Sequence, residues 1–269
     1  MSHLGIETSY QTLRVHVAEG RRTVVFDRAE QRNSFNSRLL GELAHALDEA
    51  QRDPSCRMVV LEGQQGYFSS GLDFEDGLDR RGPEGSAAYM DALRRLGSLP
   101  AVVVASVDGQ VRAGGLGFVA VSDVVVATPR STFGLPEALW GLVPACVGLH
   151  LSRRIGLHHT KRLCLTTENL TASQALDIGL VDEVTERPEE VQRRLWLKVS
   201  RLTPSTLGRI KRYFGDIAGI AEAQEARAMQ ETDRAMNDPE VRGAIENFVR
   251  HGTFPWEGGR PGSPRGRRS

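Results

Sequence analysis

Two glycine-containing segments have the residue types needed to hold an oxygen that gains negative charge. SSGLDFED (residues 69–76) and RAGGLGFVA (residues 112–120) each follow an apolar run. Glycine lets a ligand approach the backbone closely, and a turn that leads into a helix leaves N–H groups unpaired. The N–H groups of Leu72 and Gly114 are therefore candidates for an oxyanion hole. The alternative is that Gly71 and Gly114 serve only as turn residues.

The second segment also matches a dinucleotide-binding fingerprint. GLGFVA (residues 115–120) has the spacing G-x-G-x-x-A, and Glu137 lies twenty residues beyond Gly117. In that fingerprint, however, the acidic residue ends the next strand, whereas the next apolar run (residues 124–127) is followed by Thr128. The predicted helix is also shorter than a crossover usually needs. The oxyanion interpretation is therefore favoured.

Four segments together resemble the crotonase (enoyl-CoA hydratase/isomerase) superfamily, in order and at its usual separations. They are FSSGLDFED, DGQVRAGGLGFVAVSD, FGLPEALWGLVPA and TTENLTASQALDIGLVDEV, and the similarity extends from Tyr10 to Glu257. The resemblance implies that Leu72 and Gly114 supply the two oxyanion N–H groups. It also implies that Gly71 and Gly115 border the bound substrate, and that the glycines admit a thioester carbonyl.

One departure from the family pattern concerns the catalytic carboxylates. Typical hydratases of the family carry two glutamates, but the position of the first is Gly117 here, and only the second is present, as Glu137. A single carboxylate and an oxyanion hole can still remove a proton next to a thioester and pass it to a leaving hydroxyl. Burial beside Leu135, Leu139 and Trp140 would raise the pKa of Glu137 toward the useful range. The alternative role for Glu137 is a helix N-terminal carboxylate after proline.

A narrower resemblance is carried by YQTLRV, EALWGLVPACV, LSRRIG and GTFPWE. These segments are similar to dehydratases of polyketide β-branching, which convert 3-hydroxy-3-methylglutaryl-acyl carrier protein to the 3-methylglutaconyl thioester. This implies an acyl carrier protein as partner and no cofactor beyond its phosphopantetheine. The related decarboxylases carry a lysine after the first turn, whereas no lysine precedes Lys161 here. The alternatives are a hydratase or isomerase of coenzyme A esters and a non-catalytic scaffold.

Other side chains have two interpretations each. Asp73 can orient the substrate hydroxyl or cap the turn that follows it, and His251 can reach a substrate carboxylate or complement a helix end. Arg112 can pair with a substrate carboxylate or be solvated. Arg28 and Arg32 are candidates for docking the acidic carrier protein.

Composition sets the class of protein. The chain has 269 residues, of which 40% are hydrophobic and 25% charged, as in soluble globular proteins. It contains no apolar span long enough for a membrane and opens without a secretory signal pattern, so we expect a cytoplasmic protein without membrane contact. Four of the last ten residues are arginine and none is acidic, which leaves the rest mildly acidic and disfavours nucleic-acid binding.

The elements that must position these residues alternate between strand and helix as far as Val184, after which only helices are predicted. Strands are predicted at 13–17, 23–26, 58–61, 101–107 and 124–127, and helices at 38–51, 87–96, 115–122, 151–165, 189–202, 205–216, 220–236 and 239–250. By resemblance, the fold is an α/β crotonase-like ββα spiral (residues 1–200). A C-terminal helical trimerisation module (201–257) and a disordered basic tail (258–269) follow it. The resemblance implies a homotrimer, with trimers able to pair into hexamers.

Overall fold

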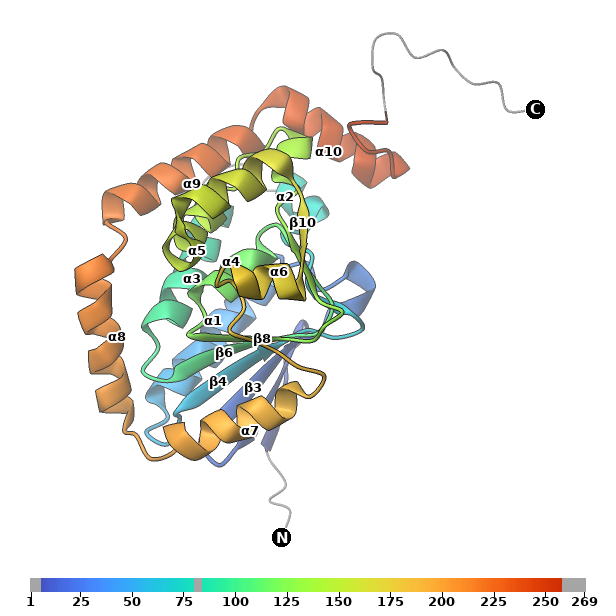
Figure 1. The fold of residues 1–269 in the computed structure, drawn as a ribbon. Coiled ribbons are helices and arrows are strands. Elements are labelled where there is room, and N and C mark those ends of the chain that lie inside the picture. Colours follow the sequence, from blue (N-terminus) through green and yellow to red (C-terminus); the bar gives the residue numbers. More distant parts are fainter. Residues whose placement is uncertain (1–5, 80–83, 258–269) are drawn as a thin grey trace.

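Two β-sheets form the centre of the molecule (Figure 1). The computed structural model describes residues 6–79 and 84–257. The larger sheet has the order β1 (Ile6–Ser9), β2 (Leu13–Ala18), β3 (Arg21–Phe26), β4 (Met58–Glu62), β6 (Val102–Val107), β8 (Val124–Ala127) and β11 (Glu183–Val184). Strands β1 to β3 pair antiparallel, and β3, β4, β6, β8 and β11 pair parallel.

The smaller sheet is built from strands of three residues. Its order is β10 (Asn169–Thr171), β9 (Thr132–Gly134), β7 (Gln110–Arg112) and β5 (Tyr67–Ser69). Along the chain, β4 is followed by β5, β6 by β7, and β8 by β9. In each case a strand of the larger sheet is followed by one of the smaller sheet, and the pair leads into a helix. This repeat of ββα units confirms the predicted spiral.

Helices cover both faces of the larger sheet. They are α1 (Ser37–Arg52), α2 (Phe74–Asp79), α3 (Glu84–Ser98), α4 (Gly115–Val121), α5 (Ala145–Thr166), α6 (Ala172–Asp177), α7 (Pro188–Val199), α8 (Pro204–Ala218), α9 (Glu222–Met236) and α10 (Pro239–His251), with short 3-10 turns η1 (Ala29–Gln31) and η2 (Glu137–Trp140). The long helix α5 is interrupted at Gly156, which has a non-helical φ of 79°. Among the described residues, no helix is both long and apolar enough to cross a membrane.

The alternation of side chains along β4 shows how the layers are divided. Val59 and Leu61 belong to the main core beneath α1, α3 and α4, whereas Met58 and Val60 pack on the opposite face with Val191 of α7. These four side chains are fully buried, which explains why the strand is a continuous apolar run in the sequence. Figure 1 shows α7 alone on its side of the sheet.

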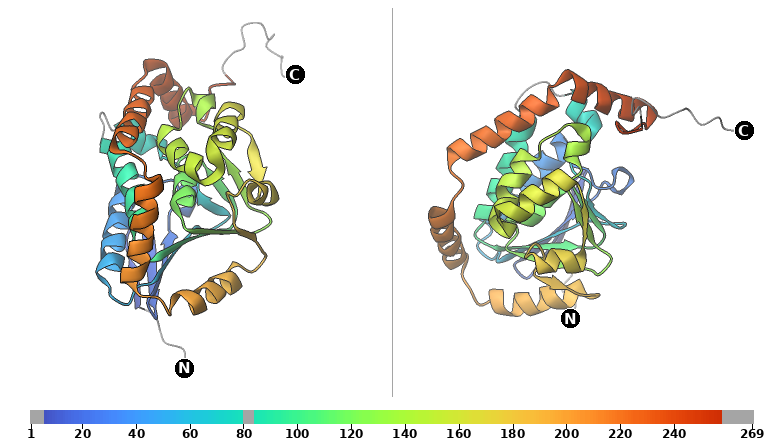
Figure 2. Two further views of the ribbon diagram at one scale, coloured as in Figure 1. Left: turned by 60° about the vertical axis from the view of Figure 1, so that its left-hand side comes forward. Right: turned by 45° about the horizontal axis from the view of Figure 1, so that its top comes forward.

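The C-terminal helices fold back over the spiral (Figure 2). Helix α9 contacts α3 and α5, and α10 contacts α2 and η2. The predicted helical module at 201–257 is therefore helical, and its last two helices lie on the side of the molecule where the candidate residues gather. The predicted basic tail, residues 258–269, lies outside the described residues.

Candidate active site

The first predicted oxyanion turn connects β5 to α2. Gly71 has a φ of +92°, a conformation that L side chains rarely adopt. Its carbonyl accepts a hydrogen bond from the N–H of Phe35 at 2.8 Å, and the N–H of Asp73 donates to the carbonyl of Phe35 at 2.9 Å. These two bonds hold the turn in place. The N–H of Leu72 lies between them and donates to no backbone or side-chain acceptor within residues 6–79 and 84–257.

The second turn connects β7 to α4. The N–H of Ala113 donates to the carbonyl of Gly134 at 3.0 Å, which ties the end of β7 to β9. Ala113 itself has a φ of +49°, and Gly114 is the N-cap residue of α4. In the described part of the chain, the N–H of Gly114 also has no hydrogen-bond acceptor. A free N–H at this turn is what the sequence predicted.

The two turns are in direct contact. A Cβ atom added at Gly71 would lie 2.7 Å from the Cβ of Ala113 and 3.1 Å from the backbone nitrogen of Gly114. Real Cβ atoms do not approach other atoms this closely without a shift, so the contact requires glycine at position 71. The structure therefore brings the two predicted N–H donors side by side.

A cavity of about 770 Å³ adjoins the two turns. Its wall includes Leu72 and Gly114 from the turns, Glu137 from η2, and Met236 and Phe248 from the C-terminal helices. Cavities of this size are typical of small-molecule sites. We refer to it as the active-site cavity.

Glu137 is the one acidic group of the predicted set that is buried in the cavity wall. Its exposed fraction is 9%, and its Oε2 atom has no hydrogen-bond partner among the described residues. Burial in these surroundings raises the pKa of Glu137 to about 8. Of the three neighbours named for Glu137, Leu135 and Trp140 are buried, whereas 43% of the Leu139 side chain is exposed.

The alternative role proposed for Glu137 fits the structure poorly. Glu137 is indeed the first residue of η2, directly after Pro136. However, η2 is a single turn of four residues, so its dipole is small. The buried Oε2 atom accepts no hydrogen bond from the first turn of η2 or from any other described residue, so capping does not account for it.

Asp73 lines the cavity, but both of its carboxylate oxygens are engaged. Oδ2 lies 2.7 Å from Nη2 of Arg28 in an ion pair with both side chains largely buried, and Oδ1 accepts a hydrogen bond from the N–H of Glu75 at 3.1 Å. Asp73 therefore caps the start of α2, which was the alternative interpretation. Its predicted contact with the substrate hydroxyl would compete with these bonds.

Gly115 and Gly117 face packed protein rather than the cavity. A Cβ atom at Gly115 would lie 2.7 Å from the carbonyl oxygen of Ser69, and one at Gly117 would lie 1.9 Å from Oη of Tyr89. Neither glycine belongs to the cavity wall. The structure thus places the predicted substrate residue Gly115 at a contact between α4 and β5, and the dinucleotide interpretation of these glycines has no support in the geometry.

His251 does not join the other candidates. It is exposed in the last turn of α10, where a basic side chain complements the helix end, and it is absent from the cavity wall. Gly71 is buried and absent from the cavity wall, and its lack of a side chain lets the two turns touch. The predicted substrate residues therefore separate into Asp73 at the cavity and Gly71, Gly115 and His251 outside its wall.

The predicted arginines differ in their surroundings. The Arg28 guanidinium binds Asp73 and also donates to the carbonyl of Ser34, so it is not a free rim charge. Arg32 is exposed, with its guanidinium carbon 5.7 Å from the centre of the Tyr67 ring. Arg112 donates to the carbonyl and hydroxyl oxygens of Thr132 across the smaller sheet.

The sequence did not indicate two aromatic features of the site. Phe35 and Tyr89 stack with ring centres 4.8 Å apart beside Gly114, and no local motif points to either. A second group closes the cavity from the C-terminal side: Trp140 lies 5.1 Å from Phe248 and 6.0 Å from Phe254, measured between ring centres. Phe254 of this group belongs to the GTFPWE segment, which contributed only to the narrower resemblance.

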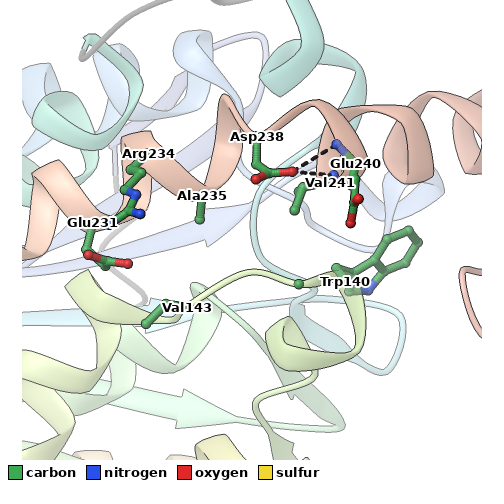
Figure 3. Close-up of a pocket in the computed structure, with 9 residues that line it drawn as sticks. Trp140, Val143, Glu231, Arg234, Ala235, Asp238, Glu240 and Val241 are labelled. Atoms are coloured by element: carbon green, nitrogen blue, oxygen red, sulfur yellow. Dashed lines mark hydrogen bonds between the residues drawn. The ribbon is translucent and has the colours of Figure 1, made fainter.

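A separate hollow of about 520 Å³ lies between the η2 loop and the junction of α9 and α10 (Figure 3). Its charged groups include Glu231, Arg234 and Asp238, and Asp238 caps α10 by accepting from the N–H groups of Glu240 and Val241. It contains neither of the free N–H groups nor Glu137. Among the described residues, no cluster of histidine, cysteine and acidic side chains could hold a metal ion.

Comparison with known proteins gives a consistent result. The family model for enoyl-CoA hydratase/isomerase matches residues 18–259. The bacillaene synthase dehydratase PksH of Bacillus subtilis is 30% identical, over 93% of this chain and 98% of that protein. The 2,3-dehydroadipyl-CoA hydratase of Escherichia coli is 30% identical over 68% and 74%.

Solved structures give the same result for the fold. The crystal structure of a polyketide biosynthesis enoyl-CoA hydratase (pksH) from Bacillus subtilis is 29% identical, with a TM-score of 0.87, and covers 92% of this chain and 100% of that one.

Proposed function

The chain belongs to the enoyl-CoA hydratase/isomerase (crotonase) family, and on this premise we propose that it is a dehydratase acting on 3-hydroxy-3-methylglutaryl-acyl carrier protein. The observation that carries the proposal is the cavity in which two unpartnered N–H groups accompany one unpartnered, buried carboxylate. The similarity to PksH over nearly the full length of both chains supports the polyketide setting.

The first step of the proposed reaction is removal of a proton from C2 of the substrate. The thioester oxygen accepts hydrogen bonds from Leu72 and Gly114, which stabilise the negative charge that develops on it. The carboxylate of Glu137 takes the C2 proton, and the electrons of the C2–H bond form the enolate. The loss of one oxyanion donor typically costs roughly 3–4 kcal/mol of transition-state stabilisation.

The second step expels the hydroxyl group from C3. The enolate electrons form the C2–C3 double bond while the C3–O bond breaks, and protonated Glu137 returns its proton to the departing oxygen. The products are one 3-methylglutaconyl thioester and one water molecule, and Glu137 is again a carboxylate. A pKa of about 8 suits a group that must both accept and donate a proton near neutral pH.

The absence of the first of the two glutamates typical of the family's hydratases favours elimination by Glu137 alone. Position 117 is glycine, and Tyr89 occupies the space that a side chain at this position would need. No lysine precedes Lys161 in the chain, so the segment after the first turn lacks the lysine typical of the related decarboxylases. We therefore expect loss of water and not of carbon dioxide.

An acyl carrier protein is the partner that this substrate requires, and it delivers the thioester on phosphopantetheine. Carrier proteins are acidic, so a positive rim charge near the cavity would speed association. Arg32 lines the cavity and is exposed, which makes it the better docking candidate of the two predicted arginines.

We expect the chain to assemble as a homotrimer, as the family resemblance implies. Helix α8 exposes a row of apolar side chains in the single chain, namely Ile210, Tyr213, Phe214 and Ile217. Exposed apolar surface of this kind is typical of protein interfaces. Light scattering after gel filtration, with Phe214→Asp as the variant, tests both the trimer and the hexamer.

The proposed activity is tested by mass spectrometry of carrier-bound 3-hydroxy-3-methylglutaryl incubated with the protein. We expect loss of one water from the carrier-bound acyl group, and a fall of roughly 10²–10⁴-fold in the rate for Glu137→Gln. Glu189→Gln, an exposed change on α7, is the matched control.

Three outcomes would contradict the proposal. Release of carbon dioxide by the protein alone would make it a decarboxylase. A clear preference for the free coenzyme A ester would favour a hydratase of primary metabolism. No turnover of any acyl thioester would favour a non-catalytic scaffold.

A further inference from the structure

Tyr89 of α3 lies beside the oxyanion turn in the wall of the active-site cavity, and the proposed mechanism gives it no role. Its exposed fraction is 6%, and its ring stacks on Phe35 with ring centres 4.8 Å apart and planes 4° apart. The edge of the same ring meets Phe118 of α4 at 5.7 Å. Two aromatic neighbours therefore fix the orientation of the phenol.

The phenol hydroxyl binds the backbone of the oxyanion residue itself. Oη of Tyr89 donates to the carbonyl oxygen of Gly114 at 2.5 Å, and the same carbonyl accepts from the N–H of Gly117 at 3.0 Å. Gly114 has no side chain, so its φ and ψ angles are free to change unless its backbone is held from outside. The phenol supplies that restraint from a residue 25 positions away in the sequence.

The contact also explains the residue at position 117. A Cβ atom there would lie 1.9 Å from Oη and 3.0 Å from Cζ of Tyr89. Any side chain at 117 would therefore displace the phenol and break its bond to Gly114. The glycine that replaces a carboxylate in this chain is the residue that makes room for the tyrosine.

We propose that Tyr89 is a positioning residue of the oxyanion hole, which holds the Gly114 peptide so that its free N–H stays directed at the thioester oxygen. This inference rests on the proposed function for its substrate but concerns the geometry of the donor. Burial raises the pKa of Tyr89 well above 10, so the phenol stays protonated and remains a donor. Its proton is committed to the Gly114 carbonyl, so in this arrangement the phenol does not donate to the substrate.

The kinetic test is Tyr89→Phe, which removes the hydroxyl and retains the stacked ring. Because the hydrogen bond improves a donor that acts mainly in the transition state, we expect kcat to fall roughly fivefold to twentyfold with KM within about twofold of the wild-type value. The pH dependence of kcat/KM should keep its wild-type apparent pKa. Tyr10→Phe is the matched control, because it also loses a phenol hydrogen bond, to His45 at 2.9 Å, but far along the chain from Gly114.

The second test does not depend on turnover. Butanoyl-pantetheine has no hydroxyl group to lose, so the infrared carbonyl band of this bound thioester reports only on the oxyanion hole. We expect the band to shift to lower frequency in the wild-type protein and in Tyr10→Phe, and to shift less in Tyr89→Phe. A merely structural role for Tyr89 would change the melting temperature without changing this band.

The outcomes separate the two proposals. If the wild-type protein fails to dehydrate its substrate but the band shift depends on Tyr89, the proposed function is wrong and the positioning role stands. Equal band shifts and equal kcat in wild type and Tyr89→Phe would overturn the positioning role. Loss of one limb of the pH profile in Tyr89→Phe would also overturn it, because Tyr89 would then be a catalytic acid.

Discussion

Glu137 combines two properties that a surface carboxylate does not have. It is buried, and one of its oxygens is left without a partner among the described residues. Such an arrangement destabilises the charged form of the folded protein, which is the reason why the pKa is raised to about 8. This destabilisation of the charged form makes the carboxylate a stronger base toward a C–H bond than an ordinary glutamate.

This raised pKa predicts opposite effects of pH on activity and on stability. Activity should rise as the pH increases through about 8, because the base form of Glu137 is the form that accepts the C2 proton. Stability should fall over the interval from about 4.5 to about 8, because in that interval the folded state holds a proton that the unfolded state has released.

The measurement is a comparison of wild-type protein with Glu137→Gln. The variant has no carboxylate to ionise, so its advantage in melting temperature over the wild type should grow between pH 5 and pH 9. A difference in melting temperature that stays constant over this range would contradict the raised pKa.

Gly117 gives a second prediction at the scale of single residues. In Gly117→Ala the new methyl group meets Tyr89, whose ring is fixed by Phe35 and Phe118. We expect a loss of about 1–3 kcal/mol in the free energy of unfolding, measured with urea, together with a lower kcat. Gly41→Ala in α1 is the matched control, since nothing lies within 4 Å of the added atom, and it should stabilise the protein.

The sequence predicted those site residues whose role follows from a local motif. Leu72 and Gly114 follow from glycine turns and Glu137 from the P-E pattern, and each is at the cavity. The pairing of Asp73 with Arg28 was not predicted, because it joins residues 45 positions apart, and Tyr89 was missed for the same reason. Contacts between distant segments leave no pattern in a single sequence.

At the scale of elements, the number of residues in a strand or helix determined whether the sequence could predict it. Every predicted strand and helix is present with boundaries shifted by at most three residues, except that α5 begins six residues before its predicted start. The whole smaller sheet was missed, because each of its strands has only three residues and such a run shows no periodicity. Yet β5 and β7 are the strands that lead into the two oxyanion turns.

Arg28 and Arg32, the two arginines considered for docking, flank η1 between β3 and α1. Their different surroundings lead to a different prediction for each. Arg32→Glu should slow the use of carrier-bound substrate and spare a short pantetheine thioester, because an exposed rim charge acts on association. Arg28→Glu should impair both substrates, because it leaves Asp73 facing a like charge in a largely buried pair. The test is kcat/KM for each substrate at low and high salt.

Two results would contradict this division of roles. Equal losses on both substrates for Arg32→Glu would point to damage in the cavity instead of docking. Selective loss of carrier-bound substrate for Arg28→Glu would mean that its ion pair with Asp73 is dispensable.

At the scale of the whole molecule, the C-terminal helices have a role beyond the assembly predicted for them. Helix α9 adds Ala228 to the main core and Met236 to the cavity wall, and α10 adds Phe248 to the aromatic group around Trp140. The predicted boundary near residue 200 therefore separates the spiral from helices that complete its site.

Removal of these helices should be disruptive even for a single chain. A protein that ends before Ser205 loses the cover of α3 and α5 and two of the three residues of the aromatic group, Phe248 and Phe254. We expect insoluble or unfolded protein, measured by soluble yield and circular dichroism. A soluble truncated chain with wild-type turnover would contradict both the cavity wall and the predicted trimer module.

The aromatic closure formed by Trp140, Phe248 and Phe254 has a consequence for the order of events during biosynthesis. Glu137 and both oxyanion turns leave the ribosome well before α9 and α10, and chains fold largely in the order of their synthesis. A nascent chain that still lacks α9 and α10 is therefore without helices on which both the main core and the cavity wall depend. Release of the C-terminal helices is then the event that completes the fold and the active-site cavity together.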